Sequence, residues 1–233
     1  MARISRKQLK QDRFVEEVGQ SVVYVSSHRK QLLIWGGLVI ALVIAVASYA
    51  GYRRTRAEET RAEFQKAVEM YHGKVDTQQQ PGGITFPTTI ARFRDTTEQL
   101  EKVISEYAGR EEAVAAVYYL ALLEIEQEKL EEAQKRLGGI VDNKGEYPAL
   151  ARLTLAGLHA RRQEDEQARR HYQHLIDNPT RVVPKSRAQL ALARYLSATD
   201  KEEEAKTILE EMMKEPGTAG ISAGTTLTEL DGS

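Results

Sequence analysis

Residues 118–137 read YYLALLEIEQEKLEEAQKRL, and two later stretches, 153–172 and 190–209, repeat their plan at offsets of 35 and 37 residues. In each stretch two alanines stand twelve positions apart, with a leucine directly before the first alanine and a large side chain three positions before it. The pairs are Ala121 with Ala133, Ala156 with Ala168, and Ala193 with Ala205. This recurrence indicates a repeated structural unit.

The spacing of these alanines predicts pairs of antiparallel helices. Two helices joined by a short turn approach closely only where small residues face each other, and the neighbouring large side chains fill the space between pairs. Each pair leaves one apolar face uncovered, so the units must stack. Turns are expected at Glu128–Lys129, Gln163–Glu164 and Thr199–Lys201. Because no strand-like alternation is sustained beyond Ile90, the predicted fold class is all-α, a solenoid of helical hairpins.

The pattern of small and large positions resembles the tetratricopeptide repeat, whose period is about 34 residues. The tryptophan and the turn glycine that are usual in that repeat are missing, and the only tryptophan, Trp35, lies outside the repeats. The resemblance implies a tetratricopeptide-like solenoid over residues 90–216 that binds other proteins.

A fourth, split hairpin is expected before these three. Residues 54–72 would be its first helix and 90–107 its second, joined by an enlarged loop at 76–89, DTQQQPGGITFPTT. The side chains expected to face inward are Phe93, Leu100 and Ile104. The alternative is that residues 53–75 form only a helical stalk.

Two further segments adjoin the repeats. Phe86 in the loop is expected to attach the loop to the domain rather than to bind a ligand. The C-terminal residues 217–233 are small and polar, and we expect them to be disordered.

Residues 31–52 read QLLIWGGLVIALVIAVASYAGY and carry no charge. As a helix rising about 1.5 Å per residue, this run spans roughly 33 Å, enough to cross a bilayer core of about 30 Å. The sequence therefore predicts one transmembrane helix. The alternative is a cleaved secretory signal, which is disfavoured because 30 residues precede the run and because the run exceeds the usual signal core of about 7–15 residues.

Charge is distributed unevenly along the chain. Residues 1–30 hold seven Lys/Arg and three Asp/Glu, a net +4, whereas residues 53–233 hold 26 and 31, a net −5. The basic tail favours a cytoplasmic N-terminus with the repeat domain across the membrane, and it suits contact with anionic membrane lipid. A mildly acidic repeat domain argues against nucleic acid as a partner. The absence of cysteine excludes disulfides and cysteine-based metal or redox sites.

Within the tail, apolar residues recur at helical spacing: Phe14, Val18, Val22 and Val25. This spacing indicates an amphipathic helix lying on the inner leaflet, with a partly ordered segment as the alternative.

No catalytic, cofactor or metal site is predicted. His171 and His174 share a helix face at a spacing that can present two metal ligands, but no third ligand is evident, and histidines on polar helix faces are common. The sequence contains neither a phosphate-binding glycine loop nor a serine in a nucleophile elbow. The chain is therefore predicted not to be an enzyme.

The active surface is expected on the first helix of each hairpin, which lines the concave side of a stacked solenoid. Aromatic, aliphatic and arginine side chains there suit the capture of a peptide segment. The predicted residues of this protein-binding groove are Tyr118, Leu122, Glu126, Leu150, Arg161, Arg187 and Arg194. Tyr118 and Leu122 are equally compatible with a core position between repeats. In the membrane run, small residues four apart would allow a partner helix to approach closely: Gly37, Ala41 and Ala45.

The order of a basic tail, one span, an Ala/Arg/Glu-rich helix and degenerate tetratricopeptide units resembles the bacterial ancillary subunit of the Sec translocon. The most similar stretches are Phe14–Glu17 and Phe64–Val68, whereas the long loop at 76–89 departs from that family's compact turn. The resemblance implies a single-pass inner-membrane protein with a periplasmic repeat domain, whose partners are translocon subunits, periplasmic chaperones or exported chains. The alternative is a structural or assembly subunit of another bacterial envelope complex, with self-association through the span.

Overall fold

The computed structural model describes residues 6–76, 83–214 and 217–231, without the side chains of residues 6–29, 31–33, 230 and 231. Over these residues the fold is all-α, as predicted, apart from one pair of two-residue strands. The elements are α1 (Arg6–Tyr71), β1 (Lys74–Val75), β2 (Thr85–Phe86), α2 (Thr89–Glu106), α3 (Glu111–Glu126), α4 (Leu130–Gly138), α5 (Tyr147–Arg161), α6 (Asp165–Asp177), α7 (Lys185–Ser197), α8 (Glu202–Met213) and α9 (Thr218–Asp231). The chain divides into two compact units, Met1–Glu58 and Glu59–Ser233.

The first unit consists of helix α1 up to Glu58. The helix begins at Arg6, so the basic tail is helical, while the four apolar side chains predicted for its amphipathic face lie outside the described side chains. Between Ile34 and Tyr52 the large apolar side chains are 55–68 % exposed. In the part of the chain that the structure describes, α1 is the one helix long and apolar enough to cross a membrane.

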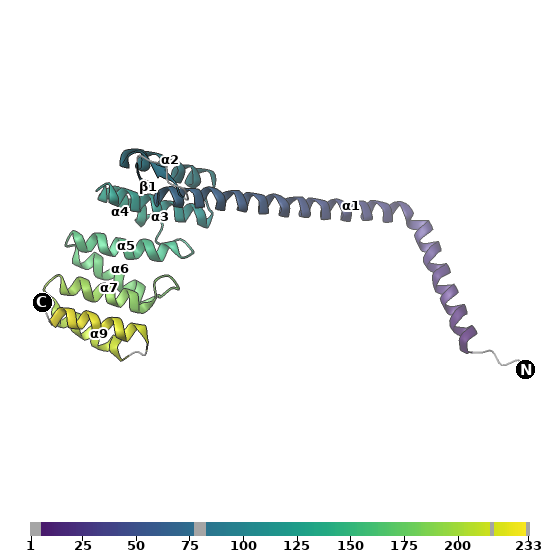
Figure 1. The fold of residues 1–233 in the computed structure, drawn as a ribbon. Coiled ribbons are helices and arrows are strands. Elements are labelled where there is room, and N and C mark those ends of the chain that lie inside the picture. Colours follow the sequence, from purple (N-terminus) through teal and green to yellow (C-terminus); the bar gives the residue numbers. More distant parts are fainter. Residues whose placement is uncertain (1–5, 77–82, 215–216, 232–233) are drawn as a thin grey trace, which may run out of the picture. The chain divides into compact units, whose positions relative to one another are not determined.

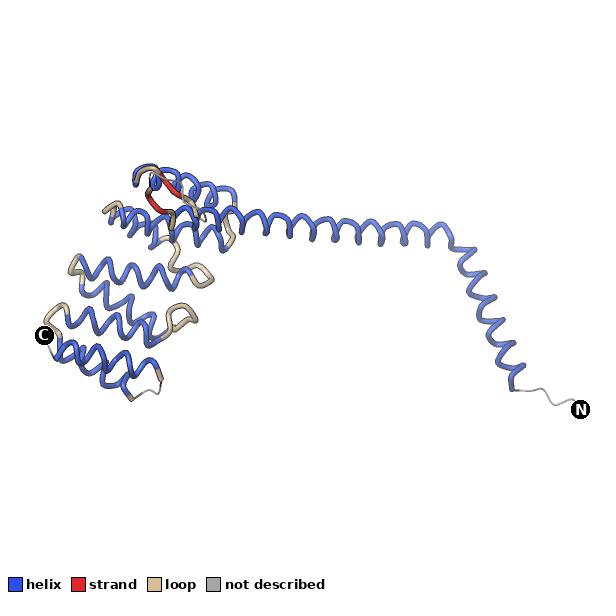
Figure 2. The backbone as a smooth tube through the Cα atoms, in the orientation of Figure 1, coloured by secondary structure: helices blue, strands red, loops and turns tan. Residues whose placement is uncertain are grey.

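The second unit is a stack of helical hairpins, which Figure 1 shows following one another in chain order from α2 to α9. Helix α3 pairs with α4, α5 with α6, and α7 with α8, and each helix also packs on the next one along the chain. Figure 2 shows the loops gathered at the helix ends. Acidic residues open α3, α4, α6 and α8, where they favour helix formation by facing the positive end of the helix dipole.

The alanines predicted at the helix crossings are all fully buried, with an exposed fraction of 0 %. Ala121 and Ala133 lie in one apolar cluster, which joins α3, α4 and α5. The remaining four alanines lie together in a second cluster that joins α5, α6, α7 and α8: Ala156, Ala168, Ala193 and Ala205. The structure therefore confirms the pairing expected from their spacing.

Each of the three hairpins turns on one residue with left-handed backbone geometry. These residues are Glu128, Gln163 and Asp200, with φ of 59°, 58° and 56°. At each turn the next backbone N–H donates to a carbonyl five residues back, as in Lys129 to Glu124 at 2.9 Å and Glu164 to His159 at 3.0 Å. This geometry closes a helix C-terminus and usually requires glycine. The turns lie where the sequence placed them, but they use side chains that disfavour the conformation.

Replacing Glu128 or Gln163 with glycine is therefore expected to stabilise the repeat unit. Glycine removes the steric cost of a left-handed residue, and its greater flexibility in the unfolded chain offsets part of the gain, leaving about 1 kcal/mol for each change. Urea titration of the full chain in mild detergent would measure this. Asp200→Gly is the control, because aspartate tolerates the left-handed region and should gain less. Loss of stability in E128G and Q163G would contradict the assignment of these turns.

The end of α1 forms the first helix of a fourth hairpin rather than a free stalk. Ala67 is fully buried in a cluster with Leu100 and Val103 of α2, and Phe93 and Ile104 pack against the same cluster. Two polar contacts add to this packing: Glu63 accepts hydrogen bonds from Gln99 at 2.7 Å and from Lys102 at 2.9 Å.

The loop after α1 is tied down by a short parallel ladder between β1 and β2, which the sequence did not predict. Phe86 at the end of β2 is only 5 % exposed, so it attaches the loop to the domain as expected. Gly73 allows this contact, because a Cβ atom there would lie 2.5 Å from the Phe86 ring. Residues 77–82 lie outside the described residues.

The prediction of a disordered C-terminus is wrong for residues 218–231, which form helix α9. Helix α9 packs on α8 and α7, with Ala223 fully buried and Leu227 packed against the last apolar cluster. The physical reason is that the final hairpin leaves an apolar face uncovered, and a terminal helix closes it. Small residues suit this contact because they let the helix approach closely.

Candidate functional site

Five aromatic side chains from the first helices of three successive hairpins lie in contact with one another. We call them the aromatic band: Phe64 and Tyr71 of α1, Tyr118 and Tyr119 of α3, and Tyr147 of α5. Phe64 and Tyr71 are two helical turns apart and so share a face. Pro148 in the first turn of α5 restricts the backbone next to Tyr147. All five rings are partly exposed.

Tyr119 lies at the centre of the band. Its ring centroid is 5.3 Å from that of Tyr71, 5.9 Å from that of Phe64 and 6.2 Å from that of Tyr147. Tyr118 adds a further contact, because its ring centroid is 5.7 Å from that of Tyr147. The edge-to-face and tilted geometries are the favoured ones for aromatic pairs. The band therefore forms one continuous surface across three hairpins.

Arg92 of α2 holds one end of the band in place. Its guanidinium donates to the backbone carbonyl of Tyr71 at 2.9 Å, which satisfies a free carbonyl at the end of α1. It also pairs with the carboxylate of Glu126 on α3, with 2.6 Å between Nη2 and Oε2. The Tyr71 hydroxyl hydrogen-bonds to the same carboxylate. Three helices are thus joined through one partly buried ion pair.

The local environment favours the protonated form of three phenols of the band. Burial and then the carboxylate of Glu126 raise the pKa of Tyr71, and burial raises the pKa of Tyr147 to about 12. Burial also raises the pKa of Tyr119. Neutral phenols offer hydrogen-bond donors beside apolar ring surface, a combination suited to binding a polypeptide segment.

Of the predicted groove residues, Tyr118 lies in the aromatic band and Glu126 contacts it through Tyr71. Leu122 is partly buried on the same helix. Leu150 is likewise partly buried and packs against a cluster containing Leu175 and Val183, as Tyr118 does against the cluster of Ala121 and Ala133. The role of Leu150 in binding stays a prediction.

The three predicted arginines are exposed and lie outside the band. Arg161 approaches Glu128 at 3.9 Å, an exposed pair of little energetic weight. Arg187 donates to the backbone carbonyl of Val182 at 3.0 Å, and Arg194 projects from the same helix, α7. Their role in binding stays a prediction.

Sequence reasoning did not select Phe64, Tyr71, Tyr119 or Tyr147. A signal is present in the sequence, because Phe64 and Tyr71 are seven residues apart on one helix face and Tyr119 directly follows Tyr118. The sequence could not supply the distances between these rings, because they lie on helices of three different hairpins.

A family model for the tetratricopeptide repeat-like domain matches residues 26–171, more than half of the chain. The chain belongs to the tetratricopeptide repeat-like domain family. Two solved structures of TPR-like repeats, assigned to a kinesin light chain of Podosopora anserina, have TM-scores of 0.53 and 0.54. One of them is a single-substitution variant. Each is 14 % identical in sequence to this chain. The matched region covers 74 % of this chain and 84 % or 85 % of the other, and at this identity the likeness shows the fold alone. No curated protein matches the sequence.

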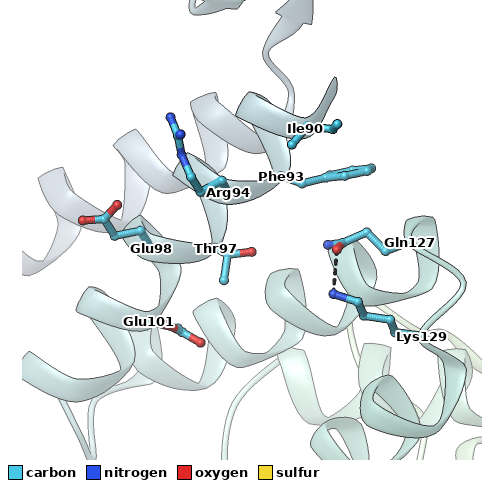
Figure 3. A pocket seen from close by; sticks show the side chains of 8 residues that line it. All are labelled: Ile90, Phe93, Arg94, Thr97, Glu98, Glu101, Gln127 and Lys129. Atoms are coloured by element: carbon cyan, nitrogen blue, oxygen red, sulfur yellow. Dashed lines mark hydrogen bonds between the residues drawn. The ribbon is translucent and has the colours of Figure 1, made fainter. Parts of the chain in front are cut away.

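The tetratricopeptide repeat-like unit also has a shallow pocket of about 520 Å³ on α2 (Figure 3). Ile90, which is 80 % exposed, and Phe93 form its apolar side. Gln127 and Lys129, joined by a hydrogen bond of 2.9 Å, lie across from them. The pocket lies between α2 and the turn from α3 to α4, and none of its lining residues belongs to the aromatic band.

One pair of facing positions in the hairpins, with one position on each helix, carries different residues from repeat to repeat. In the α3–α4 hairpin, Arg136 binds Glu124 with two nitrogens, at 2.7 Å for the shortest contact. The equivalent residues of the next hairpin, 35 positions later, are His159 and His171, whose rings stack with centroids 5.3 Å apart. The third hairpin has Leu196 and Ile208 in their place, 37 positions further on.

The ring nitrogens of the histidine pair are only partly hydrogen-bonded. His159 shares a hydrogen bond of 2.5 Å with Glu164, but the buried Nδ1 of His171 has no hydrogen-bond partner. Burial, followed by the influence of His159, lowers the pKa of His171 to about 4. Among the described residues, no group of three or more His, Asp or Glu side chains is arranged to hold a metal ion.

Proposed function

We propose that this protein is a membrane-anchored adaptor whose aromatic band captures a segment of a partner polypeptide. The observation that carries the proposal is the contact of five partly exposed aromatic rings contributed by three successive first helices. A tetratricopeptide repeat-like fold is typical of protein-interaction scaffolds, and tyrosine is enriched among residues that dominate binding energy. We assign the protein no catalytic role.

Exposure of the apolar run supports the membrane anchor. Eleven large apolar side chains from Ile34 to Tyr52 are at least 55 % exposed. Exposing such a surface to water costs about 25 cal/mol of free energy for each Å² of apolar area. The hydrocarbon core of a bilayer would cover the same surface and remove this cost. The proposed topology is a single-pass bacterial inner-membrane protein with a cytoplasmic N-terminus and a periplasmic repeat domain.

The more specific proposal is a role in protein export beside the Sec translocon. An anchor of this kind would tether the repeat unit to the membrane across which exported chains emerge, in an extended state that exposes apolar side chains. Translocon subunits and periplasmic chaperones are the further partners proposed. The support is the layout of tail, span and repeats, together with the aromatic surface.

The test is in-cell photocrosslinking from the aromatic band. A photoreactive phenylalanine analogue in place of Tyr118 or Tyr147 should crosslink the same polypeptides, including secretion components. The matched control is Glu210, an exposed residue of the second helix α8, from which those crosslinks should be absent. Crosslinking that is no stronger from Tyr118 and Tyr147 than from Glu210 would refute the binding site. A topology reporter fused after Ser233 that reads cytoplasmic would refute the export role.

A structural or assembly role in another envelope complex is the second candidate. It is supported by the exposure of Gly37, Ala41 and Ala45 on α1, with no other group within 4 Å of a Cβ built at Gly37. Such a face would let a second span, including one from another copy, approach closely. Replacing Gly37 and Ala41 with leucine should then break the assembly while the repeat unit stays folded, as judged by circular dichroism.

A further inference from the structure

Two tyrosines and two arginines form a single stripe on α1 at the C-terminal end of the apolar run. We call Tyr49, Tyr52, Arg53 and Arg56 the Tyr–Arg stripe. At about 100° of rotation per helical residue, the four residues fall within about 100° of arc. Arg54 lies on the other side of the helix, about 150° from the centre of the stripe. All of these side chains are exposed.

Each arginine of the stripe contacts a tyrosine one turn earlier. The Arg53 guanidinium lies 6.0 Å from the centroid of the Tyr49 ring, the distance of a cation–π contact. The Nε of Arg56 donates to the Tyr52 hydroxyl at 3.3 Å. These contacts order two cationic groups directly beyond two phenol rings, along one face of the helix.

The chemistry of the surroundings selects an anion. The sequence contains no aspartate or glutamate between Glu17 and Glu58, so neither the apolar run nor the turn that holds Tyr49, Tyr52 and Arg53 contributes a negative side chain. The first negative side chains, Glu58 and Glu59, follow Arg56. Guanidinium groups bind phosphate through parallel hydrogen bonds, and tyrosine favours the depth of the lipid headgroups. Apart from Arg54 on the opposite face, the neighbouring side chains at this depth are small, with Ser48, Gly51 and Thr55.

We propose that the Tyr–Arg stripe binds the phosphate of one anionic phospholipid at the membrane boundary of the span. The inference rests on the proposed membrane anchor and adds a specific lipid contact to it. Arg53 supplies the contact, and the Tyr49 ring orients its guanidinium. The stripe thereby fixes the depth and rotation of α1 at that boundary.

The test is native mass spectrometry of the full chain in detergent micelles, titrated with phosphatidylglycerol or with phosphatidylcholine. Wild type should retain one phosphatidylglycerol at lower lipid concentration than phosphatidylcholine. Arg53→Gln should raise the required phosphatidylglycerol concentration at least fivefold. Arg54→Gln is the matched control, because it removes the same charge at the same depth from the opposite face, and it should leave the titration unchanged.

Three results would overturn the proposal. Equal losses in R53Q and R54Q would indicate diffuse attraction, equal retention of the two lipids would remove the anionic preference, and displacement of the lipid by millimolar inorganic phosphate would indicate a free-phosphate site. Vesicle flotation distinguishes failure of the proposed lipid site from failure of the proposed membrane anchor. Wild-type protein that does not float with phosphatidylcholine vesicles refutes the membrane anchor, whereas protein that floats but shows no difference between the variants refutes only the lipid site.

Discussion

Replacing Ala168 with leucine is expected to lower the free energy of unfolding of the repeat unit by about 3 kcal/mol, the upper part of the range for overpacked cores. Ala168 is fully buried in the same apolar cluster as Ala156, its partner in the hairpin. Three added carbon atoms would force α5 and α6 apart. Because each hairpin packs on the next, the displacement would also disturb α7.

The measurement is a urea titration of the full chain in mild detergent, followed by far-ultraviolet circular dichroism. Ala62→Leu is the matched control, since Ala62 lies exposed on the helical end of α1 and should change stability by no more than about 0.5 kcal/mol. Equal effects of A168L and A62L would show that the alanines do not define the helix crossing. Ala156→Leu should behave like A168L, and combining the two should cost less than their sum because both changes open the same contact.

Converting the histidine pair to the apolar pair of the third hairpin should stabilise the protein by about 1–2 kcal/mol at neutral pH. The variant carries His159→Leu together with His171→Ile, which reproduces Leu196 and Ile208 at the equivalent positions. It removes the buried Nδ1 of His171, which has no partner, and gives up the hydrogen bond between His159 and Glu164. Glu164 keeps its ion pair with Arg162, at 3.1 Å.

The same variant should remove a pH dependence. The pKa of His171 is lowered from 6.5 to about 4 in the folded protein. The unfolded chain therefore binds more protons between these values, and wild type should lose about 2 kcal/mol of stability as the pH falls from about 6.5 to 4, a figure reduced for the partial burial of the ring. The pKa of Glu164, lowered by its hydrogen bond to His159, acts in the same direction at the acid end.

Urea titrations at neutral and acid pH would measure both effects. The histidine-free variant should show a smaller decrease than wild type over this interval. Gln134→Ala is a control at the neighbouring contact between α4 and the end of α5, where Gln134 accepts a hydrogen bond from Arg162 at 2.9 Å and no histidine takes part. An equal decrease in wild type and in H159L/H171I would show that the histidine pair is not the origin of the acid sensitivity.

Much of the repeat architecture could be predicted because it depends on local spacing. The twelve-residue separation of Ala121 and Ala133 specifies a crossing within one hairpin, and the turn at Glu128 lies between them at a predictable place. The C-terminal helix α9 could not be predicted in this way. Its sequence is weakly helical by composition, and it is the uncovered face of α7 and α8 that stabilises it.

The aromatic band was predicted only through Tyr118. Phe64, Tyr119 and Tyr147 come from three hairpins, and their contacts depend on how the hairpins stack. Leu150 lies at the repeat position of Ala115, 35 residues earlier, and packs partly buried against a cluster that contains Val183. A position in the repeat specifies a helix face, but not whether the neighbouring segment covers that face.

The sequence by itself determined the helical hairpins, their order and the exposed apolar run, because these follow from periodicities within a single hairpin or helix. Tertiary structure alone decided which aromatic rings meet, how Arg92 joins α1, α2 and α3, and whether the C-terminus folds. The physical reason is that these features depend on distances between segments far apart in the chain, which are fixed only when the hairpins bury their apolar faces against one another.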